Sequence, residues 1–112
     1  MQGECATIWL VKDRWGRDFV LYDDTWYNHI LPRHRLLLGH EGAVAKVLTN
    51  PFRVMHDATD SLRECFYRRR VHPDFPELFL KVCVELTSNR GGLVVTAFLA
   101  PTIRSDEVQR WP

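Results

Sequence analysis

The chain of 112 residues has the length and composition of one folded domain. Its hydrophobic fraction of 46% and charged fraction of 26% exclude a disordered tail, a collagen-like fibre and a disulfide-dense miniprotein. A formal net charge of +1 does not by itself indicate a nucleic-acid binder. Residues 29–70, however, hold eight basic and four acidic side chains and four of the five histidines. They predict a local surface that attracts anions, although a solvated basic stripe would explain the charge alone more simply.

The cysteines and the N-terminal sequence favour the cytoplasm. Three widely spaced cysteines without a C-x-x-C pair fit a reducing compartment. The N-terminus lacks the pattern of a signal peptide, and no apolar run reaches the roughly 20 residues that a membrane span needs. We therefore expect a cytoplasmic protein without membrane contact, in which Cys65 and Cys83 serve packing and not nucleophilic chemistry.

The first half of the chain predicts a hairpin followed by two helices. Residues 6–11 and 19–22 are β-branched and aromatic runs, separated by a polar loop with a central glycine. A helix is expected from about residue 25 to Leu31, because Pro32 cannot continue it. A second helix is expected over residues 41–49, stopped by Asn50 and Pro51.

The second half predicts four strands, over residues 52–55, 64–70, 78–86 and 93–99. Gly91 and Gly92 are assigned to the last hairpin turn. The expected fold of the single domain, residues 1–112, is therefore α+β: an N-terminal hairpin and two helices followed by a four-stranded antiparallel meander.

The alternation within residues 78–86 predicts which side chains face the helices. Leu80, Val82 and Val84 are expected to pack on them, which leaves Lys81 and Cys83 on the open face. Symmetric turns would place Tyr67 opposite Lys81 and Thr96 opposite Cys83, so that Tyr67, Lys81 and Thr96 cluster. On an open face Lys81→Ala would spare folding.

Patterns of metal and phosphate sites are missing from the sequence. It has no H-E-x-x-H, no zinc-finger spacing, no EF-hand loop and no phosphate loop, so neither a metal nor a cofactor is expected. His29 and His34 lie roughly 140° apart on a regular helix and would share one site only if the break at Pro32 brings them round. Otherwise each is a surface or helix-end histidine.

Several short motifs follow one another in a characteristic order. They are Asp13-x-x-Gly16-Arg17, Trp26-x-x-His29-Ile30-x-x-x-His34, Asn50-Pro51-x-x-Val54, Cys65-x-Tyr67-Arg68-Arg69, Leu80-Lys81-Val82-x-Val84 and Val94-Val95-Thr96-Ala97. Over residues 13–100 this order resembles the phage-associated nuclease-like domains of the barnase, EndoU, colicin and RelE (BECR) superfamily. The chain departs from that pattern at Arg35, where members usually have proline, and at Pro32.

The resemblance implies a metal-independent endoribonuclease, phage-derived or toxin-like. His29, Tyr67, Lys81 and Thr96 match the family's site positions, with His34 as a further catalytic candidate. The arginines expected to contact RNA are Arg33, Arg68 and Arg69. Such a hydrolase lets the RNA 2′-OH attack the phosphate and leaves a 2′,3′-cyclic phosphate, with histidine moving protons and cations stabilising the charge.

Two other classes of function remain open at this stage. The first is a non-catalytic RNA-binding or protein-interaction module on the same fold, which needs only cations and stacking aromatics. The second is the toxin of a toxin–antitoxin pair, whose partner would be a protein inhibitor. RNA is the expected partner of the enzyme.

Overall fold

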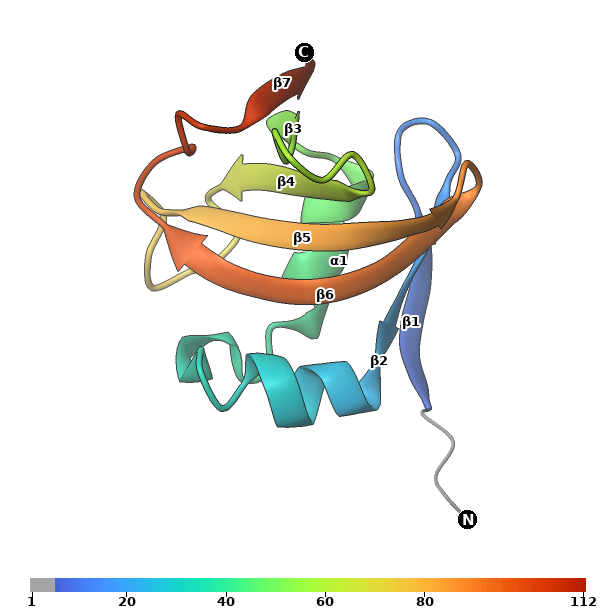
Figure 1. Cartoon of the computed structure of the whole chain (residues 1–112). Helices are drawn as coiled ribbons and strands as arrows, with labels where there is room; N and C mark the ends of the chain where they lie inside the picture. Colours follow the sequence, from blue (N-terminus) through green and yellow to red (C-terminus); the bar gives the residue numbers. More distant parts are fainter. Residues whose placement is uncertain (1–5) are drawn as a thin grey trace.

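A single seven-stranded mixed sheet dominates the computed structural model, which describes residues 6–112 (Figure 1). The strands in chain order are β1 (Thr7–Lys12), β2 (Asp18–Tyr22), β3 (Arg53–His56), β4 (Arg63–Arg69), β5 (Phe79–Ser88), β6 (Gly91–Ala100) and β7 (Val108–Trp111). Across the sheet their order is β1-β2-β6-β5-β4-β3-β7. All neighbours are antiparallel except β2 and β6, which run parallel.

The predicted fold class is therefore wrong. The hairpin is not a separate unit, because β2 hydrogen-bonds to the beginning of β6 and so extends the main sheet. A further strand, β7, pairs with β3 at the opposite edge. Within the described residues only one segment forms an α-helix, where two helices were expected.

Gly91 and Gly92 explain how the hairpin joins the sheet. They begin strand β6 and do not form the expected turn. A Cβ on Gly91, whose φ is 144°, would lie 1.8 Å from the carbonyl oxygen of Asp18, and a Cβ on Gly92 would lie 1.9 Å from that of Glu85. Only glycine allows β6 to approach both neighbouring strands this closely, and glycine inside a strand is a known mark of such an approach.

The helical segments follow the predicted boundaries more closely than the predicted types. The α-helix α1 spans Glu41–Thr49, as expected, and Asn50 and Pro51 end it. The first helix is a short π-helical segment, η1 (Thr25–Ile30), in which the N–H of Leu31 donates to the carbonyl of Trp26. A 3₁₀ turn, η2 (Arg35–Leu37), follows Pro32.

The main core lies between one face of the sheet and these helical segments, and α1 runs behind the sheet in Figure 1. Leu80, Val82 and Val84 of β5 point into this core, as their alternation predicted. The strand register is also confirmed, since Tyr67 pairs with Lys81 and Cys83 with Thr96.

The opposite face of the sheet, here the second face, carries a smaller buried cluster that includes Cys65, Tyr67, Phe79 and Cys83. Residues 101–112, here the C-terminal segment, run from the end of β6 to the far edge of the sheet (Figure 1). Ile103 of this segment packs on the cluster. The second face is thus partly covered, which corrects the expectation of an open one.

Lys81 shows the consequence of this cover. Its side chain faces away from the helices, as predicted, but it is only 4% exposed. A strand after residue 100 was not predicted, so nothing in the predicted fold could bury this lysine. Among the residues that the structure describes, no helix is long and apolar enough to span a membrane.

Candidate RNA-binding and catalytic site

A line of aromatic and cationic side chains crosses the second face from β3 to β6. We call it the aromatic–cationic row, and its members in spatial order are Phe52, Phe79, Tyr67, Lys81, Phe98 and His34. Strand register explains the middle of the row, because Lys81 of β5 lies opposite Tyr67 on β4 and opposite Phe98 on β6. Directly opposed residues point to the same face of a sheet.

Lys81 is the centre of the row. Its Nζ lies 5.2 Å from the ring centre of Tyr67 and 5.5 Å from that of Phe98, distances at which a cation is attracted to an aromatic ring. Its ammonium group also forms an ion pair with Glu107 at 3.0 Å. Lys81 is therefore a cation almost inaccessible to solvent, and water screens its electric field only weakly there.

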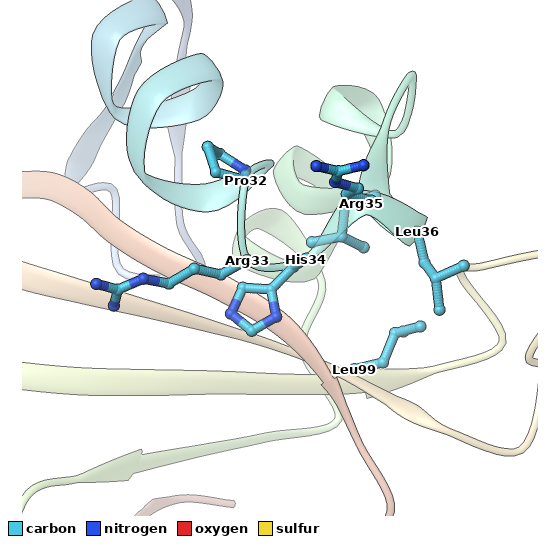
Figure 2. Close-up of a pocket in the computed structure, with 7 residues that line it drawn as sticks. Pro32, Arg33, His34, Arg35, Leu36 and Leu99 are labelled. Atoms are coloured by element: carbon cyan, nitrogen blue, oxygen red, sulfur yellow. The ribbon is translucent and has the colours of Figure 1, made fainter.

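His34 closes one end of the row. Its ring stacks on Phe98, with centres 5.3 Å apart and planes at 26°. The loop that carries it, residues 32–37, lines a pocket of about 340 Å³ together with Leu99. Figure 2 shows the His34 ring against the sheet, with Arg33 and Arg35 pointing in different directions. Partial burial, and secondarily the charge of Arg33, lower the pKa of His34, which favours the neutral imidazole that can accept a proton.

His29 lies apart from this contact. It is exposed on η1, and its Nε2 is 3.3 Å from the carboxylate of Asp24. Thus the two histidines do not share the same surroundings. The structure brings His34, and not His29, against the residue that faces Lys81.

A groove of about 290 Å³ forms the other end of the row. It is lined by Phe52, Phe79 and the three arginines of residues 68–70. The guanidinium of Arg69 lies 4.2 Å from the ring centre of Phe79, and the Phe52 side chain is half exposed. Arg68 is held in place by a hydrogen bond of 3.0 Å from its Nη1 to the carbonyl of Asn50. An exposed ring next to guanidinium groups, here Phe52 beside the arginines, suits the bases and phosphates of single-stranded nucleic acid.

Glu107, on the C-terminal segment, covers the middle of the row. One carboxylate oxygen accepts a hydrogen bond from the Tyr67 hydroxyl and the other accepts from Lys81. Burial raises the pKa of Tyr67, and the hydrogen bond to Glu107 raises it further. The hydroxyl therefore stays protonated and remains a donor at neutral pH.

The remaining predicted residues, Thr96 and Arg33, lie next to members of the row in the sheet or along the chain. Thr96 is half-buried on β6, opposite Cys83 on the second face. Arg33 is exposed beside His34. Tyr67, Lys81 and Thr96 thus share one face, as their register predicted.

Sequence reasoning missed Phe52, Phe79, Phe98 and Glu107. Phe98 was within reach of it, because the register that pairs Thr96 with Cys83 also carries Phe98 to Lys81. Glu107 gave no signal, since it lies beyond the last predicted strand. In residues 6–112 no three His, Cys, Asp or Glu side chains gather where they could hold a metal ion.

Comparisons with protein families, with curated proteins and with solved structures found no match for this chain.

Proposed function

We propose that this chain is a metal-independent endoribonuclease that binds single-stranded RNA along the aromatic–cationic row. The observation that carries the proposal is the position of Lys81, a buried cation between Tyr67 and the Phe98–His34 stack. RNA cleavage without a metal needs a proton acceptor, a cation and hydrogen-bond donors around one phosphate. This end of the row supplies those three kinds of group.

Each group has a role in the proposed reaction. Neutral His34 takes the proton of the 2′-OH, and the 2′-oxygen forms a bond to the adjacent phosphorus. The bond from phosphorus to the 5′-oxygen breaks, the 5′-oxygen leaves with a proton from solvent water, and His34 releases its proton to solvent, so that the cyclic phosphate remains on the upstream fragment. Lys81 stabilises the negative charge that grows on the phosphate, while Tyr67 and Thr96 donate hydrogen bonds that orient it. The order of sequence motifs that resembles the BECR nuclease domains supports the same chemistry, although the sheet differs from the one that the resemblance implied.

The groove at the far end of the row supplies affinity in this proposal. A base stacks on Phe52, and Arg68 and Arg69 bind the adjoining phosphates. Binding in this groove would direct the RNA strand across the second face toward Lys81. Contacts with the backbone and with ring faces carry little sequence information, so cleavage with weak sequence preference is expected.

In this proposal the carboxylate of Glu107 has to move away from Lys81 and Tyr67 when substrate binds. A carboxylate and a phosphate accept the same hydrogen bonds from an ammonium group and a phenol. Glu107 therefore holds the position that the proposal gives to the scissile phosphate. Release of the C-terminal segment would exchange one anion for another without leaving Lys81 unpaired.

The same burial favours a second candidate function, a non-catalytic RNA-binding module. Lys81 is only 4% exposed, whereas the arginine groove is open as it stands. If Glu107 never leaves, the protein binds RNA through the groove and cuts nothing.

The experiment that separates these functions uses purified protein, mixed-sequence RNA and excess EDTA, followed by analysis of the product ends. The proposal predicts fragments that carry 2′,3′-cyclic phosphates. The His34→Gln variant is the matched control for a contaminating ribonuclease and should leave the RNA intact. RNA that is bound but uncut by the parent protein would support the binding module. A parallel reaction with Mg²⁺ in place of EDTA completes the test, and cuts that appear only there and carry 5′-phosphates would reject the mechanism.

A further inference from the structure

Cys65 and Cys83 meet on the second face although 18 positions separate them in the chain. They are directly opposed partners on β4 and β5, and their Sγ atoms are 2.9 Å apart. Both are free thiols, 3% and 5% exposed. From the sequence both were expected to be packing residues, and the register brings them into direct sulfur–sulfur contact.

The surroundings of the pair make its two sulfurs unequal. The two sulfurs share a hydrogen bond that either thiol can donate. This bond lowers the pKa of Cys83 and raises the pKa of Cys65, which burial raises further. The charged groups that act on the pair are Lys81, Glu107 and Arg63. Lys81 favours a thiolate at this position and Glu107 opposes it. Cys83 is thus the more nucleophilic sulfur, and Cys65 holds the proton.

We propose that Cys65 and Cys83 are a redox modification site that closes a reversible disulfide when the protein meets hydrogen peroxide. The inference does not rest on the proposed ribonuclease function. It rests on the opposed strand positions and on the contact between the two sulfurs.

The chemistry proceeds in two steps that balance. The Cys83 thiolate attacks one oxygen of the peroxide, the O–O bond breaks, and hydroxide leaves and takes up the proton that Cys83 had lost, forming water. Cys83 is then a sulfenic acid. The Cys65 sulfur attacks the Cys83 sulfur, the S–S bond forms and the S–O bond breaks. The departing hydroxyl takes the Cys65 proton as a second water, so two thiols lose two electrons and one peroxide gains them.

The fold is already close to the product geometry. A disulfide needs a sulfur–sulfur distance of about 2.05 Å, so the two atoms must approach by less than an ångström. No oxidant larger than peroxide has to reach the buried pair. The bond would join β4 to β5 and constrain the unfolded chain between residues 65 and 83, so the oxidised protein should melt at a higher temperature.

The test uses the Cys5→Ser variant, because Cys5 lies outside the described residues and would add a third thiol. The folded protein is treated with increasing hydrogen peroxide, then denatured, alkylated and weighed by mass spectrometry. The proposal predicts that both thiols become unreactive together, with one peroxide consumed and two hydrogen atoms lost. Dithiothreitol should restore both. Digestion should yield the peptides of Cys65 and Cys83 joined to each other within one chain.

Three outcomes would overturn the inference. They are alkylation of both thiols even after peroxide treatment, a mass gain of oxygen without a disulfide, and a disulfide between two chains. Cys65→Ser in the same background is the matched control. It should convert Cys83 into a sulfenic acid that dimedone traps, because the resolving thiol is missing. These readouts are chemical, so failure of RNA cleavage leaves them unchanged.

Discussion

Two buried cations, Arg17 and Lys81, are held by carboxylates in this molecule in different ways. The Arg17 side chain is 9% exposed and that of Lys81 is 5% exposed. Burial alone therefore does not separate them. They differ in the number of their carboxylate partners and in the elements that carry those partners.

Arg17 is held by the frame of the sheet. Its Nε bonds to Asp13 of the same loop at 2.8 Å, and its Nη2 bonds to Glu64 on β4, also at 2.8 Å. Burial lowers the pKa of Arg17, but the bonds to Glu64 and Asp13 outweigh it and raise the pKa overall. Arg110 of β7 adds a bond to Glu64 at 3.1 Å. This cluster joins three parts of the fold, the loop between β1 and β2, strand β4 and strand β7, and both carboxylate partners of Arg17 lie in the frame of the sheet.

Lys81 has its one carboxylate partner on the C-terminal segment. Glu107 lies between β6 and the four-residue strand β7, outside the centre of the sheet. A buried charge is therefore a better candidate for a functional site when its ionic partner lies outside the frame of the sheet. Arg17 stabilises the fold, whereas the proposed function has Lys81 exchange Glu107 for a substrate phosphate.

The largest loss of stability is expected from Arg17→Met. It leaves Asp13 and Glu64 buried without their shared cation, and breaking such a pair costs about 3–5 kcal/mol. Chemical denaturation measures the loss of unfolding free energy. Lys12→Met is the matched control, since its pair with Asp18 is exposed and should contribute less than about 1 kcal/mol. Equal losses of unfolding free energy in the two variants would contradict the structural role assigned to Arg17.

His34→Gln should lower the rate of RNA cleavage about 10²–10⁴-fold, because it removes the proton acceptor. Stability should change little, since the ring is only partly buried. His29→Gln is the control and should retain the parent rate. If only His29→Gln were inactive, the role would return to the histidine that the sequence resemblance favoured.

The pH dependence of the parent protein follows from the lowered pKa of His34. Neutral His34 persists below the ordinary histidine value of about 6.5, so the acid limb of kcat/KM should lie below that pH. Because of the same shift, as the pH falls His34 binds its proton at a higher pH in the unfolded chain than in the folded protein. His34 therefore contributes stability above about pH 6.5, which is lost as the pH falls toward its folded pKa. An acid limb above 6.5 in the pH–rate profile would contradict this assignment.

Lys81→Met should lower cleavage about 10²–10³-fold, the usual cost of losing one group that stabilises developing charge. Its effect on stability should be smaller than that of Arg17→Met, about 1–2 kcal/mol, because Glu107 can move into water once it is unpaired. This replaces the expectation that the lysine could be removed without cost. A loss as large as that of Arg17→Met would mean that the C-terminal segment cannot leave.

Phe52→Ala should weaken RNA binding by about 1–3 kcal/mol if one base stacks on this ring. Filter binding in EDTA, with the His34→Gln variant as background, measures affinity without cleavage. Leu10→Ala is the control, because Leu10 is an exposed apolar side chain on β1, at the other edge of the sheet. Equal losses in both variants would show that the groove is not the binding surface.

Local patterns in the sequence predicted most elements and the register of the central strands. Tyr67 opposite Lys81 follows from residue alternation and turn symmetry, which are local properties. The parallel pairing of β2 with β6 was beyond such reasoning, since it joins segments that are about 70 residues apart in the chain. Its signal was the Gly91–Gly92 pair, which was interpreted as a turn.

The candidate site was predictable only in part, for a similar reason. The face of Lys81 could be read from β5 alone, but its burial depends on Glu107, which returns from beyond the last predicted strand. The choice between His29 and His34 depended on the path of the chain after Pro32. Residues 31–33 form a turn and His34 itself has a non-helical backbone, with φ −137° and ψ 65°, and helical periodicity contains no information about such a path.

The most direct test of the central claim uses two RNAs of identical sequence that contain one mapped cut. In the second RNA, the nucleotide on the 5′ side of the cut carries hydrogen in place of its 2′-OH. The proposed mechanism predicts that the parent protein, in EDTA, cuts the first RNA to a 2′,3′-cyclic phosphate and leaves that position of the second intact. Cleavage of both RNAs at the same rate would contradict it, because the nucleophile would then not be the 2′-OH.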